Sequence, residues 1–281
     1  MTAAVASEPR PAFLELFEAS CRSHQSNLCV GLDPDLGGLP QGFEPTPDDV
    51  LRFVTAIIEA TAEFAAVYKP NAAFYEAMGP AGMEVLQAVV AYVPAGTPVI
   101  LDAKRGDMGN TAERYAAACF DVLGAGAVTL HPYLGRDALE PFLRRAERGV
   151  FVLCRTSNPD ADMMQLLEVG GRPLYLEVAR RCQEWNDLDN VGLVCGATRP
   201  DDVAQVRAVC PGQPILVPGV GPQGGDLEAA ARAAAGEGAG HPFVISASRS
   251  ITGASRDHDY QHAANSAADD LRRQINAALH R

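Results

Sequence analysis

Eight short apolar or β-branched runs alternate with longer alanine-rich segments, and this alternation is the strongest constraint on the fold. The runs cover residues 28–32, 66–69, 99–102, 127–130, 150–154, 191–195, 215–217 and 243–245. Segments with the apolar spacing of amphipathic helices lie between them, at 49–64, 82–92, 111–123, 173–184, 200–209 and 227–235. Near-continuous apolar strands separated by helices predict parallel pairing, so eight such units predict an α/β fold, a single (β/α)8 TIM barrel.

An open doubly wound sheet is the alternative architecture. Such a sheet usually carries a Gly-x-Gly-x-x-Gly turn after its first strand, where this chain has Gly31-Leu32-Asp33-Pro34-Asp35. We therefore favour the barrel, with a flexible N-terminal tail at 1–12, one catalytic domain at 13–281 and a polar C-terminal end after Arg256. Between the fifth and sixth strands, residues 157–171 form an extra loop that could cover a site.

Composition excludes several classes of function. The formal charge is −12 and no cluster of Lys or Arg is longer than two residues, which argues against nucleic acid as a partner. There is no apolar stretch of membrane-spanning length and no apolar signal core near the N-terminus, so we expect a cytoplasmic protein. The seven cysteines are scattered, and His258 and His262 have helical spacing but no third ligand nearby, so no disulfide framework or metal site is predicted.

Only two of the 23 basic residues are lysines, Lys69 and Lys104, and each lies at or just beyond the end of an apolar run. Lysine differs from arginine in carrying a compact ammonium that can give up a proton. Lys104 also lies between Asp102 and Asp107; residues two apart on a strand share a face, so Asp102 should lie beside it. Gly106 would let the chain turn and send Asp107 elsewhere, including into a neighbouring subunit. A purely structural salt-bridge network is the alternative, but burying such charges is costly, which favours a function.

Catalytic groups of TIM barrels lie at the carboxyl ends of the strands. The polar residues that follow the predicted strands are Asp33, Lys69, Asn71, Asp102, Lys104, Asp107, His131, Arg155, Thr156, Ser157, Ser248 and Arg249. Barrels frequently bind phosphate between the loops after strands seven and eight, which are here residues 218–226 and 246–251. We therefore predict a phosphate site there, with Arg249 as its cation.

Six motifs together resemble the orotidine 5′-phosphate decarboxylase family, in particular its longer-chain bacterial form. They are Gly31-Leu32-Asp33-Pro34, Tyr68-Lys69-Pro70-Asn71, Leu101-Asp102-Ala103-Lys104-Arg105-Gly106-Asp107, Arg155-Thr156-Ser157-Asn158-Pro159, Pro218-Gly219-Val220-Gly221 and Ser248-Arg249-Ser250-Ile251. The resemblance covers residues 27–251. It implies a homodimeric carboxy-lyase that converts orotidine 5′-phosphate to UMP and carbon dioxide in de novo pyrimidine synthesis, without a metal or an organic cofactor.

The resemblance also implies a role for each candidate residue. Lys104 would donate a proton to C6 of the pyrimidine, Asp102 would lie beside the departing carboxylate, and Asp107 would enter the partner subunit's site. Lys69 would bridge Asp102 and the ribose, and Asp33 would bind a ribose hydroxyl. Asn71 and Thr111 are further implied substrate contacts. Either Thr156 or Ser157 would contact the base, and Gln223, Ser248 and Arg249 would lie around the phosphate. Serines flank Arg249 where many family members have glycine.

Three other functions remain open at this point. A sugar-phosphate decarboxylase or aldol-type synthase of the same superfamily shares the Asp-x-Lys-x-x-Asp motif but requires magnesium. A Schiff-base aldolase would use Lys69 or Lys104 as a nucleophile, which requires a lysine with a depressed pKa. A sensor would bind a phosphate ligand without turnover.

Overall fold

The computed structural model describes residues 12–220, 225–237 and 240–280, so the predicted tail lies almost entirely outside it. Its main sheet consists of β1 (Leu28–Leu32), β2 (Val67–Pro70), β3 (Ile100–Arg105), β4 (Ala127–Leu130), β5 (Gly149–Arg155), β8 (Val191–Cys195), β9 (Ile215–Pro218) and β10 (Phe243–Ala247). The strands are parallel, in the order β2-β1-β10-β9-β8-β5-β4-β3. Single parallel bridges from Tyr68 to Val99 and from Asn71 to Asp102 join β2 to β3. The predicted TIM barrel is therefore confirmed.

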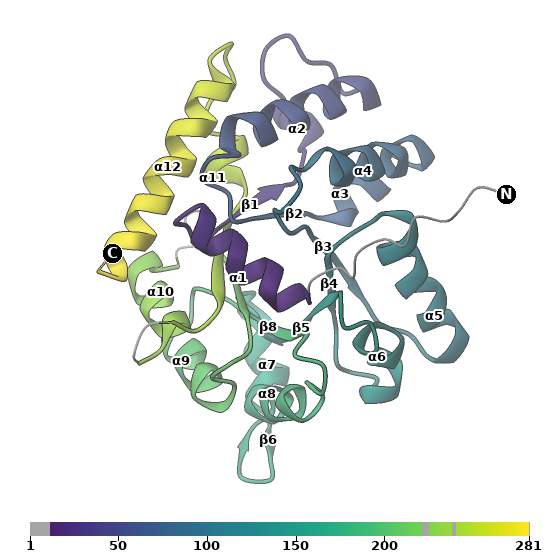
Figure 1. The fold of residues 1–281 in the computed structure, drawn as a ribbon, viewed down its shortest axis with the longest axis vertical. Helices are drawn as coiled ribbons and strands as arrows, with labels where there is room; N and C mark the ends of the chain where they lie inside the picture. Colours follow the sequence, from purple (N-terminus) through teal and green to yellow (C-terminus); the bar gives the residue numbers. More distant parts are fainter. Residues whose placement is uncertain (1–11, 221–224, 238–239, 281) are drawn as a thin grey trace, which may run out of the picture.

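Helix α1 (Phe13–Ser23) lies across one end of the barrel, and the other helices lie around it (Figure 1). These are α2 (Pro47–Thr61), α3 (Ala72–Glu76), α4 (Pro80–Tyr92), α5 (Gly109–Ala117), α6 (Arg136–Leu143), α7 (Asp162–Gln165), α8 (Leu174–Glu184), α9 (Pro200–Val209), α10 (Leu227–Ala235), α11 (Arg249–Thr252) and α12 (Tyr260–Ala278). All six predicted helices are present. The expectation of a merely polar end after Arg256 is wrong, because α12 buries Ala264, Ala268 and Ile275, which lie on one face.

The extra loop between β5 and β8 has structure of its own. It contains a 3-10 turn (Pro159–Ala161), the short helix α7 and an antiparallel pair, β6 (Glu168–Val169) with β7 (Arg172–Pro173). The insertion thus projects from the barrel as a small hairpin below α8 (Figure 1).

Each strand of the barrel contributes one side chain to a dry layer inside it. These residues are Cys29, Val67, Ile100, Ala127, Phe151, Val194, Leu216 and Val244, with Phe13 and Phe17 of α1 packed against them. Helix α1 thereby closes the amino-terminal end of the barrel, and Figure 1 shows it lying across that end. Burying a phenylalanine side chain contributes roughly 1.5–3 kcal/mol, so α1 is firmly docked.

Side-chain alternation then decides what lies above this dry layer. Residues two positions further along a strand point to the same side, one step nearer its carboxyl end. Lys69, Asp102 and Thr129 stand in this relation to Val67, Ile100 and Ala127. The barrel therefore places a polar layer directly on an apolar floor.

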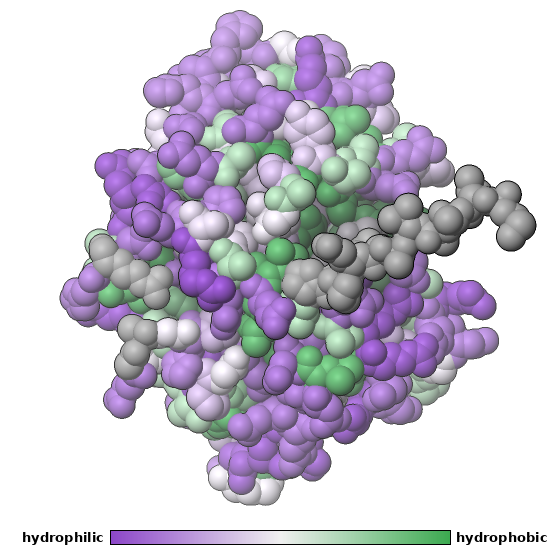
Figure 2. Space-filling view, in the orientation of Figure 1, coloured by the Kyte–Doolittle hydropathy of each residue, from purple (hydrophilic) through white to green (hydrophobic). Residues whose placement is uncertain are grey.

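The outer surface is mostly polar. Figure 2 shows hydrophilic residues over the outer helices on the face that carries α1. Among the helices of the described ranges, none is both long and apolar enough to cross a membrane.

Candidate active site

One carboxylate bridges two ammonium groups at the carboxyl end of the barrel. Lys69 Nζ lies 3.3 Å from Asp102 Oδ2, and Lys104 Nζ lies 2.7 Å from Asp102 Oδ1. The side chains of Lys69 and Asp102 are 6% and 13% exposed, whereas that of Lys104 is 49% exposed. The array is therefore closed on the Lys69 side and open to a ligand at Lys104.

Lys69 and Asp102 are both charged at neutral pH. Burial by itself would raise the pKa of Asp102, but Lys69 and then Lys104 outweigh it and hold this pKa at about 2. Burial would likewise lower the pKa of Lys69, but the carboxylates of Asp33 and Asp102 together raise it above its ordinary value. Lys69 thus remains an ammonium and Asp102 a carboxylate.

A break in the β3–β4 ladder shapes the backbone that carries these groups. The register between the two strands shifts between Leu101 and Arg105, and Lys104 has a φ of 48°. This left-handed conformation is uncommon for a residue other than glycine. Asp102 and Lys104 do meet, but the expected reason was wrong, since the contact depends on this irregular backbone and not on a regular extended strand.

Gly106 has a packing role that the sequence did not indicate. Its φ is not positive, so a left-handed conformation is not the reason for a glycine here. A Cβ at this position would lie 2.2 Å from Nε2 of His131. The glycine is needed because the His131 ring, which follows β4, lies directly against the backbone.

Asp107 lies apart from the array. Its Oδ1 accepts the backbone N–H of Met108 at 2.8 Å, and its carboxylate forms no ion pair with any residue in the described ranges. Large apolar side chains are exposed after β3 and β4, with Met108 at 62%, Tyr133 at 83% and Leu134 at 41%. A charged group without an ion partner thus lies on the same barrel end as uncovered apolar surface.

Asp33 and Asn71 meet at the ends of β1 and β2. Asp33 Oδ1 accepts the backbone N–H of Asn71 at 3.1 Å. The side-chain oxygen of Asn71 accepts the N–H of Ala73 at 3.1 Å and so caps α3, which leaves its amide NH2 as the group available to a ligand. Thr111 is exposed in the first turn of α5.

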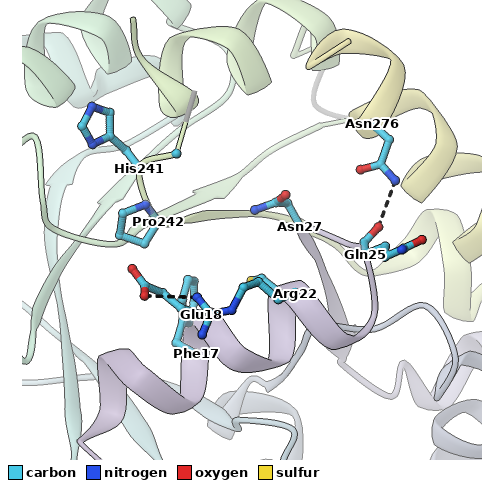
Figure 3. A pocket seen from close by; sticks show the side chains of 10 residues that line it. Phe17, Glu18, Arg22, Gln25, Asn27, His241, Pro242 and Asn276 are labelled. Atoms are coloured by element: carbon cyan, nitrogen blue, oxygen red, sulfur yellow. Dashed lines mark hydrogen bonds and ion pairs between the residues drawn. The ribbon is translucent and has the colours of Figure 1, made fainter. Parts of the chain in front are cut away.

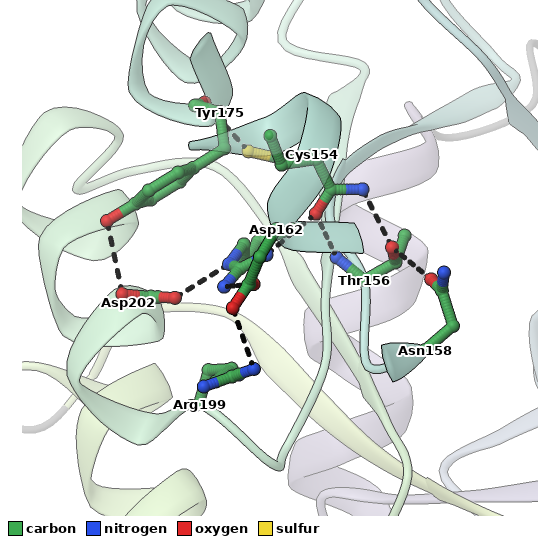
Figure 4. Close-up of polar contacts among 9 residues, drawn as sticks. Cys154, Thr156, Asn158, Asp162, Tyr175, Arg199 and Asp202 are labelled. Atoms are coloured by element: carbon green, nitrogen blue, oxygen red, sulfur yellow. Dashed lines mark hydrogen bonds and ion pairs between the residues drawn. The ribbon is translucent and has the colours of Figure 1, made fainter. Parts of the chain in front are cut away.

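Arg155, a candidate because it follows the fifth apolar run, is the last residue of β5 and anchors the loop that follows. Its side chain is 1% exposed, and it donates to Asp202 Oδ2 at 2.6 Å, Asp162 Oδ1 at 2.6 Å and Gln165 Oε1 at 3.1 Å. Gln165 in turn accepts the Thr156 N–H at 2.9 Å and donates to Thr156 Oγ1 at 2.7 Å. Figure 4 shows these polar contacts around Thr156. Arg155 therefore holds the loop in place and does not face a ligand.

The residues after β5 and β10 pack closely on neighbouring glycines. A Cβ at Gly196 would lie 2.9 Å from Cβ of Ser157, and one at Gly31 would lie 2.5 Å from Cβ of Ser248. Ser248 Oγ is buried and has no hydrogen-bond partner within the part of the chain that is described. Thr156, Ser157 and Ser248 are thus fixed by tight packing or by hydrogen bonds.

Arg249 is the exposed first residue of α11. Its guanidinium forms no hydrogen bond or ion pair with another residue of the described ranges, so it is available to an anion. Gln223, the other predicted phosphate contact, lies outside the described residues.

A groove of about 600 Å³ lies at the opposite end of the barrel. It is lined by Phe17 of α1, by Asn27 and His241, which precede β1 and β10, and by Asn276 of α12 (Figure 3). None of the charged array reaches it, so cavity size does not mark the reactive site here. Within the described ranges, no group of three His, Cys, Asp or Glu side chains could hold a metal ion.

Sequence reasoning missed Thr129 on β4. Its side chain is inside the barrel, 1% exposed, and its hydroxyl donates to Asp102 Oδ1 at 2.9 Å. The sequence could have indicated it, because Thr129 lies two residues after Ala127 on the same strand, and its side chain therefore points into the barrel as that of Ala127 does.

Comparisons with known proteins identify a family for the chain. The model of the orotidine 5′-phosphate decarboxylase / HUMPS family matches residues 26–264. A protein named orotidine 5′-phosphate decarboxylase from Roseiflexus castenholzii is 50% identical over 269 residues, covering 95% of this chain and 98% of its own length. Another from Thermomicrobium roseum is 49% identical, covering 93% of this chain and 94% of its own length.

A solved structure leads to the same family. The OMP decarboxylase of Leishmania donovani matches with a TM-score of 0.85 and 41% identity, covering 96% of this chain and 100% of that one. The chain therefore belongs to the orotidine 5′-phosphate decarboxylase / HUMPS family.

Proposed function

We propose that the protein is a cytoplasmic orotidine 5′-phosphate decarboxylase that forms UMP and carbon dioxide in de novo pyrimidine synthesis, with no metal or organic cofactor. The observation that carries the proposal is the Lys69–Asp102–Lys104 array at the carboxyl end of the barrel, where one ammonium is half exposed beside a buried carboxylate. The names of relatives at 43–50% identity support the same reaction.

The chemistry requires a fixed cation at one carbon. When the bond from C6 to the carboxylate breaks, the electron pair stays on C6 in an sp2 orbital that the ring delocalises poorly. A positioned ammonium both stabilises this charge and supplies the proton for the new C6–H bond. Lys104 is suited to this role because Asp102 Oδ1 fixes its Nζ at 2.7 Å while the side chain remains accessible.

The other residues would orient the substrate. Asp102 would lie beside the departing carboxylate, and Lys69 would connect Asp102 to the ribose. Asp33, Asn71 and Thr111 would bind the ribose or the rim around it, and Thr156 or Ser157 would contact the base. Ser248, Gln223 and Arg249 would hold the phosphate, with the free guanidinium of Arg249 as the main anchor.

We further propose a homodimer in which Asp107 completes the partner subunit's site. Two features support this: the Asp107 carboxylate has no ion partner among the described residues of its own chain, and the adjoining barrel end exposes Met108, Tyr133 and Leu134. Apolar side chains exposed near a polar rim are typical of an interface.

The first test follows the ultraviolet absorbance of orotidine 5′-phosphate mixed with the purified protein in EDTA. Wild-type protein should consume the substrate, whereas Lys104→Ala should abolish turnover and still bind UMP. Lys104→Arg is the matched control, since it keeps the charge but does not readily give up a proton, and it should also be inactive. Turnover that EDTA abolishes would point to the magnesium-dependent superfamily members, and near-normal turnover by Lys104→Ala would refute the proton-donor role.

A second test mixes Lys104→Ala chains with Asp107→Ala chains. Each homodimer should be inactive, but a hybrid dimer has one site with both residues, so full exchange should restore about a quarter of wild-type activity. Chains that carry both substitutions, mixed with Lys104→Ala chains, are the control and should restore nothing. Failure to recover activity after demonstrated chain exchange would rule out a shared site.

A third test concerns the phosphate contact. Arg249→Ala should raise KM about ten- to hundredfold, because a hydrogen bond to a charged group contributes about 1.5–3 kcal/mol. The same change should weaken binding of UMP but not of uridine, as measured by calorimetry. Arg273→Ala, on the outer helix α12, is the control, and an unchanged KM for Arg249→Ala would remove that residue from the phosphate site.

A fourth test uses the depressed pKa of Asp102. Because its folded pKa of about 2 lies below the ordinary value of 3.8, ionised Asp102 stabilises the fold above pH 4, and this contribution is lost as the pH falls toward 2. Urea unfolding should show an advantage of wild type over Asp102→Asn that shrinks by about 2 kcal/mol across this range. Asp160→Asn, at an exposed position, is the control; an advantage independent of pH would contradict the charged array.

A further inference from the structure

We propose that Thr129 is a positioning residue that sets Asp102 and Lys104 in their working geometry; its effect on turnover rests on the proposed function. Thr129 lies on β4, whereas both charged residues lie on β3. Its side chain faces the barrel interior and is 1% exposed, so no bulk water competes for its hydroxyl.

The hydroxyl of Thr129 is completely used within the site. A threonine hydroxyl has one proton to donate and two lone pairs that accept. Thr129 Oγ1 accepts the backbone N–H of Ala103 at 3.0 Å and that of Lys104 at 2.9 Å. With both lone pairs occupied, its single proton is directed to Asp102 Oδ1 at 2.9 Å. The direction of this hydrogen bond is thus fixed by the two amides.

These contacts take the place of backbone ladder hydrogen bonds where β3 and β4 are out of register. The β3–β4 register shifts between Leu101 and Arg105, so residues 102–104 depart from the regular ladder. Partly buried backbone N–H groups still favour an acceptor within the protein, and the Thr129 hydroxyl accepts from two consecutive amides. One of them belongs to Lys104, whose φ of 48° is otherwise unfavourable. Thr129 therefore stabilises the strained conformation that points Lys104 toward Asp102.

The same hydroxyl also holds the carboxylate. Asp102 Oδ1 accepts both the Thr129 hydroxyl and Lys104 Nζ, the latter at 2.7 Å. Lys69 holds the other oxygen, Oδ2. Without Thr129, Asp102 would keep both ammonium partners but lose the donor that fixes its rotation, and the Lys104 backbone would lose its acceptor.

The test compares Thr129→Val, which keeps the shape and removes the hydroxyl, with Thr129→Ser, which restores it. Thr129→Val should lower kcat about ten- to hundredfold, as small misplacements of catalytic groups do, with KM and UMP affinity changed less than about threefold. Thr129→Ser should retain most of kcat. Thr61→Val is the control, because Thr61 is also a buried threonine with hydrogen bonds, and it should lose stability without a selective loss of kcat. Unchanged kcat in Thr129→Val, or no rescue by serine, would overturn the proposal.

A second measurement does not depend on turnover. Labelling lysine with ¹⁵N gives two backbone amide signals, because the chain has only Lys69 and Lys104. In Thr129→Val the Lys104 amide should shift and exchange faster with solvent, while the Lys69 amide should not. If wild-type protein does not consume orotidine 5′-phosphate, the proposed function fails, and the two amide signals alone then test the positioning role of Thr129. An unchanged Lys104 amide signal would overturn that role. A change in the Lys104 signal without one in the Lys69 signal would support it. Thr129→Ala replaces the valine variant if that does not fold.

Discussion

The carboxylate of Asp102 is the constraint on which the rest of this barrel end depends. Removing an ion from water costs several kcal/mol, which is recovered only when partners of opposite charge are well placed. Asp102 is 13% exposed and meets an ammonium on each oxygen, and Lys69, 6% exposed, depends on Asp102 and Asp33 for its own charge. The buried charges of Asp102 and Lys69 therefore stabilise one another. The carboxyl ends of β2 and β3 are thereby tied to one another through charge, and β4 joins them through Thr129.

The apolar layer beneath the array gives its charged side chains a close-packed base. One side chain from every strand of the barrel and two phenylalanines of α1 form a dry floor. In a close-packed interior of this kind, side chains occupy defined rotamers and transmit strain instead of absorbing it. The low polarity below also strengthens the electrostatic interactions above it. The same strand alternation that buries Ile100 thus places Asp102 in a rigid polar layer, and the fold and the site have a common origin.

The alternation of apolar runs with amphipathic segments made much of this architecture predictable from sequence, since the eight runs correspond to the eight strands of the barrel. The meeting of Lys69 and Asp102 was also predictable, because the carboxyl ends of parallel strands converge. What sequence could not show were effects of tertiary contacts. The left-handed Lys104 depends on a hydroxyl from another strand, and Arg155 is paired with Asp202, which is 47 residues away. Helix α12 was overlooked because its buried face is largely alanine, a weak hydrophobic signal.

The net charge of −12 bears on how an anionic substrate would be recognised. A protein with this excess of acid does not attract an anion from a distance, and at physiological salt its field is screened within about 8 Å. Recognition must therefore come from cations at contact range, and Lys69, Lys104 and the unpaired guanidinium of Arg249 lie at the carboxyl end of the barrel. Lys69 and Lys104 are already neutralised in part by Asp102, whereas Arg249 has no carboxylate partner among the described residues. Under the proposed function, Arg249 would therefore be the main anchor of the phosphate, and the charged array would be left to act on the reacting bond.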